Sequence, residues 1–241
     1  MSAGTPAAGW LTHPLLGAAA AHGFGTRGCR PPAALLRARQ VHGTRVVVLR
    51  RGGPPPADPG EADALVSERA SLPIGVVTAD CLPILVATPA GRVAAVHAGW
   101  RGLAAGVIGE ALAALASLAP EGVAGGAAVI GPRVGAGCYE VDEPVVAALA
   151  RRFAGALDAA LVPVRAGHWQ LDLAALARVD LVRAGLAADR VRALANACTS
   201  CDERRFHSYR RDGPGSGRLF HWIAARGAGP DIGLDTPIGP A

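Results

Sequence analysis

The chain has 241 residues, which is enough for one large domain or two small ones with a buried core. Hydrophobic residues make up 51% and charged residues 18%, a balance that excludes a disordered, collagen-like or coiled-coil chain. The 24 basic residues are all arginines, against 19 acidic residues, and the net charge of +5 is dispersed along the sequence. This pattern does not favour nucleic acid as a partner, whereas small anionic substrates fit it.

The sequence contains no recognisable targeting or membrane segment. The first 21 residues lack basic residues, and the most apolar stretch, Gly102–Ala119, contains Glu110 and consists mostly of Ala and Gly. Five widely spaced cysteines, an odd number, indicate reduced thiols. We therefore expect a cytoplasmic globular protein without a membrane partner, and we favour a monomer.

The first half of the chain is dominated by predicted strands. After a start over residues 1–20 that we expect to be loose, the β-branched run Arg45–Leu49 predicts a strand, and the Pro- and Gly-rich segment Arg51–Glu61 predicts a loop. Apolar runs too short for helices, each bounded by turn residues, predict buried strands at Ile74–Val77, Ile84–Ala87 and Val93–Val96.

Helices alternate with strands in the second half. We expect one helix over Gly102–Leu118, a second from its cap Asp142 to about Leu161, and a third from its cap Asp172 to Gly185. With no repeat and no break in composition, the sequence predicts a single α/β (α+β) domain over residues 1–241, with mixed β-sheets flanked by helices and a loose tail at 227–241. The remaining strands are predicted at Ala127–Ile130, Val191–Leu194 and Leu219–Ile223.

Two reactive side chains are predicted where buried strands give way to loops. Cys81 lies in Thr78-Ala79-Asp80-Cys81-Leu82-Pro83, and His97 begins His97-Ala98-Gly99-Trp100-Arg101-Gly102. Taken singly, each residue is more often a buried core side chain than a functional one. Together on neighbouring strand ends they form either a nucleophile–base pair or metal ligands.

A third ligand-type residue, His42, precedes the strand at Arg45–Leu49. With Cys81 and His97 it makes a Cys/His₂ set, which leaves one tetrahedral position open, as in catalytic zinc sites. The spacings of 39 and 16 residues match no compact zinc motif, so the residue types carry this interpretation more than the spacing does.

Two further motifs are ambiguous by themselves. Cys198-Thr199-Ser200-Cys201 is a CxxC that fits a redox pair, half of a zinc knuckle or a tight turn. Ser208–Gly213 supplies arginines that can bind phosphate or carboxylate, or simply form a solvated surface.

Seven segments between about Gly23 and Ile223 together resemble one known family, the bacterial YfiH/laccase-domain family. Its members are variously called purine nucleoside phosphorylase, polyphenol oxidase or peptidoglycan editing factor. The resemblance implies a cysteine-hydrolase-like single α/β domain. The matching segments are Arg39–Gly43, Ala62–Val66, Thr78–Pro83, His97–Gly102, Ile130–Pro132, Cys138–Val141 and Cys198–Arg211.

The resemblance also implies a function and a site. The zinc ligands of the family correspond to His42, Cys81 and His97, and the implied reaction is phosphorolysis of adenosine, inosine, guanosine or methylthioadenosine, with adenosine deamination as a side activity. The implied partners are a purine nucleoside and phosphate, and copper is a candidate adventitious metal. We expect Asp80, Cys81 and His97 to be catalytic, with Asp80 as a proton shuttle. The expected substrate-binding residues are Arg39, Gln40, Arg101, Tyr139, Thr199 and Arg210.

Three alternatives remain at this point. A copper-dependent polyphenol oxidase with a multicopper centre needs about ten His ligands, and the chain has seven His. A metal-free cysteine hydrolase or amidase acting in peptidoglycan precursor editing would use Cys81 as nucleophile and His97 as base, but it gives His42 no task. A module that only binds nucleotides or cell-wall precursors would leave the Cys/His set unexplained.

Overall fold

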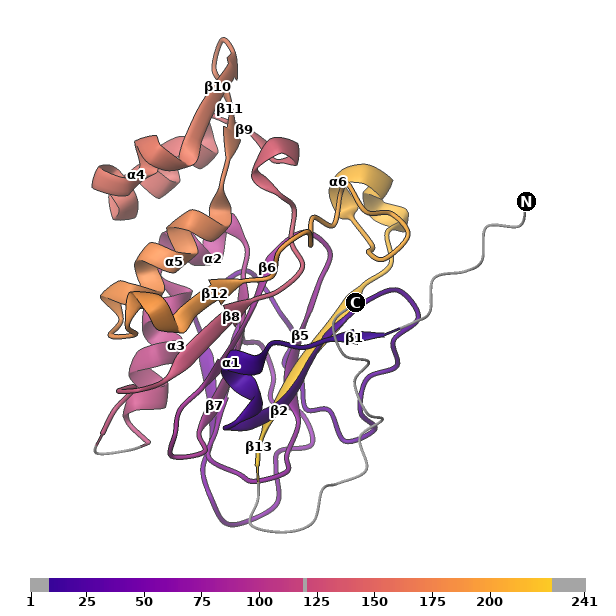
Figure 1. Ribbon diagram of the computed structural model, residues 1–241, viewed down its shortest axis with the longest axis vertical. Helices are drawn as coiled ribbons and strands as arrows, with labels where there is room; N and C mark the ends of the chain where they lie inside the picture. The colour runs from indigo at the N-terminus through magenta and orange to yellow at the C-terminus, as the bar shows by residue number, and fades with distance from the viewer. Residues whose placement is uncertain (1–8, 119–120, 227–241) are drawn as a thin grey trace, which may run out of the picture.

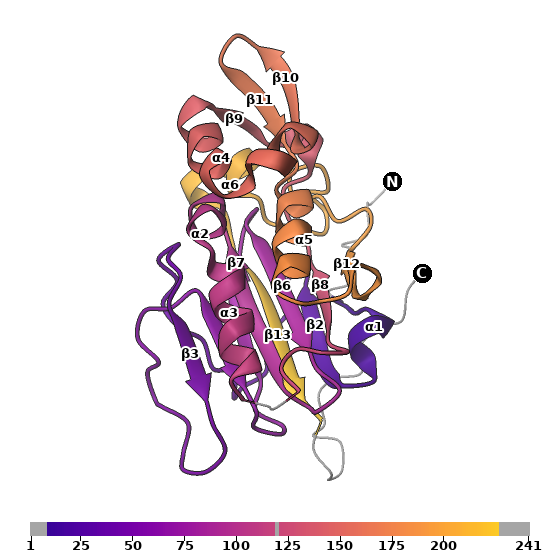
Figure 2. The same cartoon turned by 90° about the vertical axis from the view of Figure 1, so that its left-hand side faces the viewer.

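A six-stranded mixed sheet lies at the centre of the molecule, between a second sheet and a layer of helices (Figures 1 and 2). The computed structural model describes residues 9–118 and 121–226. In the central sheet the outer pairs β12–β8 and β3–β4 are parallel and the inner pairs are antiparallel. Its strands, in spatial order, are β12 (Val191–Ala193), β8 (Ala127–Ile130), β6 (Leu82–Ala87), β7 (Val93–Ala98), β4 (Ala64–Ser67) and β3 (Val46–Leu49).

Both faces of this sheet are buried, which explains why its inner strands are continuously apolar rather than alternating. Successive side chains of a strand point to opposite faces. In β6, Ile84 and Val86 pack in the core under the helices, while Leu85 and Ala87 pack in the core against the second sheet.

The second sheet joins the two ends of the described chain. Its strand order is β1-β2-β13-β5, and all its pairs are antiparallel. Figure 1 shows β2, from the start of the chain, beside β13, from its end. The bounds are β1 (Trp10–Leu11), β2 (Ala20–Gly25), β5 (Ile74–Thr78) and β13 (Leu219–Ala225).

Helices cover the opposite face of the central sheet (Figure 2). The predicted cap Asp172 accepts a hydrogen bond from the backbone N–H of Ala175, and the guanidinium of Arg152 binds the buried carboxylate of Asp180 across two helices. The four helices are α2 (Trp100–Ala105), α3 (Val107–Ala116), α4 (Glu143–Leu157) and α5 (Leu173–Arg183).

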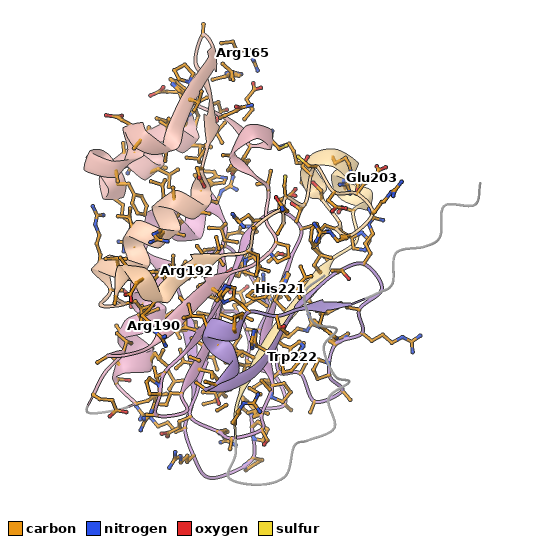
Figure 3. All side chains as sticks on the ribbon, in the orientation of Figure 1. Arg165, Arg190, Arg192, Glu203, His221 and Trp222 are labelled. Atoms are coloured by element: carbon orange, nitrogen blue, oxygen red, sulfur yellow. The ribbon has the colours of Figure 1, made fainter. Side chains whose placement is uncertain are left out.

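A small third sheet, β10-β11-β9, projects from one end of the molecule, with Arg165 in its hairpin (Figure 3). Its strands are β9 (Glu140–Asp142), β10 (Leu161–Arg165) and β11 (His168–Leu171). The short helices are α1 (Pro14–Gly17), α6 (Tyr209–Asp212), η1 (Ala136–Cys138), η2 (Asp158–Ala160), η3 (Ala188–Arg190) and η4 (Gly213–Gly215).

The predicted α/β class with mixed sheets is confirmed, as are the predicted strands, but the predictions for residues 10–20 and for the bounds of two helices are wrong. Residues 10–20 are not loose, because β1, α1 and the start of β2 lie there. The helix from Asp142 ends at Leu157, since Leu161 already pairs with Leu171 in the third sheet. The expected tail at 227–241 lies outside the described residues, as do residues 1–8.

The helix expected over residues 102–118 is two helices that meet at Gly106. Gly106 ends α2 and caps α3 with φ of 97°, a left-handed conformation that breaks the helix. Within residues 9–118 and 121–226, no helix has the length and hydropathy needed to cross a membrane.

We predict that Gly106→Ala destabilises the protein by about 1–2 kcal/mol, the cost of a left-handed conformation for an L-residue. A Cβ there would also lie 2.8 Å from Nη1 of Arg152. Gly155→Ala, inside α4 with no heavy atom within 4 Å of the added Cβ, is the matched control and should be neutral or stabilising. Urea unfolding measures both changes, and equal effects would contradict the prediction.

Candidate metal centre and arginine-lined cavity

Topology brings four distant residues to one edge of the central sheet. β7 is antiparallel to both β4 and β6, so its last residues lie beside the first residues of its neighbours. His97 is near the end of β7, Cys81 directly precedes β6, and Asp63 directly precedes β4. The loop before β3, which is parallel to β4, adds His42.

The three predicted ligands converge. The ligand atoms of His42, Cys81 and His97 all lie within 4.8 Å of one another, and Sγ of Cys81 is 3.8 Å from Nε2 of His42. A tetrahedral zinc ion with ordinary Zn–S and Zn–N lengths separates these two atom types by about 3.5 Å. The donor set and its spacing therefore fit zinc after small side-chain shifts.

Asp63 holds both imidazole-bearing segments. Its fully buried carboxylate accepts a hydrogen bond from Nδ1 of His97 at 2.7 Å. The same carboxylate accepts backbone N–H bonds from Val41, His42 and Gly43 at 3.2, 2.9 and 2.7 Å. With Nδ1 of His97 engaged, its Nε2 is left to face Cys81 or a metal, the usual carboxylate–histidine–metal arrangement.

In the absence of a metal, the pKa values of Cys81 and His97 shift in the directions that favour a thiolate–imidazolium pair. Burial raises the pKa of Cys81, but hydrogen bonds from His42 and His97 outweigh it and bring the pKa to about 6. Burial lowers the pKa of His97, whereas Asp63 and Cys81 raise it more strongly, to about 9. The thiol is thus ready to act as a metal ligand or as a nucleophile.

The backbone around the site is strained, and one glycine makes room for the ligands. His42 and Asp80 have positive φ angles of 61° and 92°, which non-glycine residues rarely adopt. A Cβ on Gly99 would lie 2.8 Å from Cδ2 of His42 and 3.0 Å from Sγ of Cys81. The two ligands therefore approach each other across a bare backbone.

A cavity of about 630 Å³ opens above the ligand set. Nine of the ten predicted site residues line this cavity, and the exception is Thr199. Those that line it are Arg39, Gln40, His42, Asp80, Cys81, His97, Arg101, Tyr139 and Arg210.

Two of the predicted substrate residues have protein partners. Both ends of the Gln40 side-chain amide pair with the backbone of Val77, so this side chain fixes the cavity wall. Arg39 forms an exposed ion pair with Glu61 at 2.8 Å.

The side chains of Arg101 and Arg210, unlike that of Arg39, pack on aromatic rings and form no ion pair among the described residues. Each guanidinium lies over an aromatic ring of the cavity wall, Arg101 at 4.3 Å from the centroid of Trp100 and Arg210 at 5.3 Å from that of Tyr139. Arg210 also donates to the backbone oxygen of Glu140. Among the described residues neither guanidinium forms an ion pair with a carboxylate, which leaves both charges available to an anion.

Asp80 connects the cavity wall to the CxxC segment through hydrogen bonds of its carboxylate. One carboxylate oxygen accepts the hydroxyl of buried Thr199 at 2.5 Å, and the other accepts the backbone N–H of Arg210 at 2.6 Å. Thr199 therefore lies behind the cavity wall and acts on it through Asp80. The CxxC itself follows β12 as a turn, and its cysteines are free thiols.

Three residues of the site, Asp63, Arg37 and Trp100, were not predicted from the sequence. Arg37 and Trp100 line the cavity. Asp63 could have been noticed as the one carboxylate that opens an otherwise apolar strand, Ala62-Asp63-Ala64-Leu65-Val66. Arg37 carries no such signal, since only the fold turns it toward the cavity.

Comparison with known proteins gives a consistent picture. Residues 24–226 match the family model described as multi-copper polyphenol oxidoreductase laccase. A purine nucleoside phosphorylase of Xylella fastidiosa (strain 9a5c) is 43% identical over 178 residues, 72% of this chain and 66% of that protein, so the match spans slightly less than two thirds of the relative's length.

A second relative and a solved structure extend the comparison. The adenosine deaminase RL5, from an unknown prokaryotic organism, is 36% identical over 198 residues, 78% of this chain and 74% of that protein. The crystal structure of the Bacillus licheniformis hypothetical protein YfiH superposes with a TM-score of 0.81 at 24% identity, covering 92% of this chain and 98% of the other. This last likeness concerns the fold.

We predict that Asp63→Asn lowers metal affinity about 10- to 100-fold, because the carboxylate orients His97 and the loop of His42. Titration of the purified protein with zinc against a chelating dye measures the affinity. Asp58→Asn makes the same chemical change in an exposed loop and should leave affinity unchanged. Equal affinities of the two variants would contradict the role given to Asp63.

We also predict that Gly99→Ala impairs metal binding without a large loss of stability. Its φ of −74° suits alanine, so the effect arises from the contact of the new methyl group with His42 and Cys81. Gly17→Ala, where the added Cβ meets no heavy atom within 4 Å, is the control. Metal content and thermal unfolding are compared, and normal metal content in Gly99→Ala would show that the ligands tolerate a side chain between them.

Proposed function

Because the chain belongs to the multi-copper polyphenol oxidoreductase laccase family, the same YfiH/laccase-domain family that its motifs resemble, we propose that it is a zinc-dependent purine nucleoside phosphorylase. The observation that carries the proposal is the His42, Cys81 and His97 set in the wall of a cavity that also contains Arg101 and Arg210, whose guanidinium groups form no ion pair with a carboxylate among the described residues. The proposed substrates are adenosine, inosine, guanosine and methylthioadenosine, with phosphate.

Phosphate binding is assigned to Arg101 and Arg210. Guanidinium groups bind phosphate oxygens through paired charge-assisted hydrogen bonds, and these two lack carboxylate partners among the described residues. Arg37, from the same wall, adds a third positive charge. Arg39 is the weaker candidate, since a phosphate there would compete with Glu61.

The purine is assigned to the aromatic wall of the cavity. Trp100 and Tyr139 offer apolar faces on which a base can stack. Burial and the nearby Cys81 thiolate raise the pKa of Tyr139 to about 12, so its hydroxyl keeps its proton and can donate a hydrogen bond.

In phosphorolysis, the bond between C1′ of the ribose and the purine nitrogen breaks, and a bond from C1′ to a phosphate oxygen forms. The purine leaves with the bonding electrons and takes up a proton, which the hydrogen phosphate supplies. The arginines hold phosphate near C1′, which lowers the entropic part of the barrier. Asp80 positions Arg210 by accepting the backbone N–H of that residue, and the second lone pair on each carboxylate oxygen is left for its proposed role as a proton shuttle.

A bound zinc ion would supply a Lewis acid at the base of the cavity. The same cavity, with water in place of phosphate, would accommodate deamination of adenosine to inosine and ammonia. We keep this as the proposed side activity, in line with the name of the relative RL5.

A metal-free cysteine hydrolase is the second candidate, and one observation favours it. Asp63 accepts from Nδ1 of His97, and His97 in turn faces Cys81, which has the order of a nucleophile–base–carboxylate triad. The lowered pKa of Cys81 suits either role. His42 separates the two candidates, because only the zinc enzyme needs it as a ligand.

We predict that His42→Ala loses bound zinc and lowers phosphorolysis at least 100-fold, since a two-ligand site holds zinc weakly. The assay measures phosphate-dependent release of hypoxanthine from inosine and of adenine from adenosine. In the wild type, a chelator should abolish the activity and added zinc should restore it.

The controls for this prediction separate the two candidates. Arg101→Gln retains the ligand set and should keep its zinc while raising the KM for phosphate. If His42→Ala keeps full activity in the presence of a chelator, the zinc enzyme is rejected. If, in addition, iodoacetamide inactivates that variant, the metal-free mechanism of the second candidate, with Cys81 as nucleophile, takes its place.

A further inference from the structure

Three of the five cysteines gather outside the cavity wall. Cys138 ends η1, while Cys198 and Cys201 begin and end the turn after β12. Their three Sγ atoms all lie within 4.8 Å of one another, and those of Cys138 and Cys201 are 3.0 Å apart. None of the three lines the cavity, and the reaction proposed above gives them no task.

The Cys198–Cys201 turn contains backbone N–H to sulfur hydrogen bonds of the kind found in metal-binding C-x-x-C turns. Sγ of Cys198 accepts the backbone N–H of Cys201 at 3.4 Å and that of Gly135 at 3.2 Å. In a C-x-x-C turn such N–H bonds stabilise a negatively charged sulfur and orient it for a ligand. The bond from Gly135 also joins the turn to the segment that carries Cys138.

An arginine side chain holds the turn of the cluster in place. The Arg211 guanidinium donates to the backbone oxygens of Thr199 and Ser200 inside the turn, at 2.8 and 3.1 Å, and forms an ion pair with Asp212 at 2.7 Å. A backbone bridge between Arg133 and Cys198 joins the turn to the segment that leads to Cys138. Three thiolates around a divalent cation would carry a net charge of −1.

We propose that Cys138, Cys198 and Cys201 form a second metal site, for a thiophilic divalent cation of which Zn²⁺ is the representative. Tetrahedral zinc with Zn–S bonds of about 2.3 Å separates neighbouring sulfurs by about 3.8 Å, within the span of the cluster. The three thiols release three protons on binding. Cys201 is exposed, so the fourth position faces solvent and takes water or an external ligand.

A metal at this second site would link two segments that support the cavity wall. Cys138 directly precedes Tyr139, and Cys198 directly precedes Thr199, whose hydroxyl holds Asp80. A metal bridging the two segments therefore fixes both ends of the wall around Arg210. The role is structural, so the inference does not rest on the proposed reaction, and only the zinc counts expected below rest on the zinc site of the proposed function.

The test is metal content and metal-dependent stability of the protein purified under reducing conditions. We expect two zinc equivalents in the wild type. Each of the three single variants Cys138→Ser, Cys201→Ser and His42→Ala should bind one equivalent. The double variant His42→Ala/Cys201→Ser should bind none. Cys29→Ser, a cysteine outside both clusters, should keep two. Added zinc should raise the Tm of His42→Ala and leave that of the double variant unchanged.

Two outcomes would overturn the proposal. Cys138→Ser and Cys201→Ser could each retain the wild-type zinc content. Alternatively, the intact wild-type chain could bind one zinc and show, by mass, a Cys138–Cys201 disulfide that lacks two hydrogens. Loss of phosphorolysis in His42→Ala, with the second equivalent of zinc retained, separates the fate of this site from that of the proposed function.

Discussion

The buried carboxylate of Asp63 is the interaction on which the site depends. It is fully enclosed, yet four donors satisfy it: one imidazole nitrogen and three consecutive backbone N–H groups. Burial by itself would raise the pKa of Asp63, but these donors lower it below its ordinary value. Asp63 thereby joins the start of β4, the end of β7 and the loop of His42 in one charged cluster.

Small residues allow this cluster to exist at the end of a tightly packed sheet. Gly99 lets His42 and Cys81 approach each other, and Gly131 faces the ring of Phe24 at a distance that leaves no room for a Cβ. The left-handed backbone of His42 and Asp80 costs on the order of 1–3 kcal/mol at each residue. Hydrogen bonds to charged carboxylates, worth about 1.5–3 kcal/mol each, offset that strain. The Ala- and Gly-rich composition is thus part of how the site is built.

The same set of side chains fits two proposed chemistries, and a bound metal would decide between them. With a metal, Cys81 and the two imidazoles are ligands, and Asp63 is the support of one ligand. Without it, Cys81, His97 and Asp63 have the order of a catalytic triad. His42 and the arginine-lined wall favour the first arrangement, because a triad uses neither.

The sequence by itself determined the fold class, most strands, and the residue types of the ligand set. Apolar runs too short for a helix and bounded by turn residues predict buried strands, and a Cys with two His at strand ends suits metal ligation or a nucleophile–base pair. It could not show the break at Gly106, because a glycine in an apolar run also fits a continuous helix. Nor could it show the roles of Asp63 and Thr199, or the meeting of Cys138 with Cys201, which lie 63 positions apart. Those contacts arise from antiparallel and parallel pairings across the central sheet, and pairing partners are set by tertiary packing rather than by local sequence.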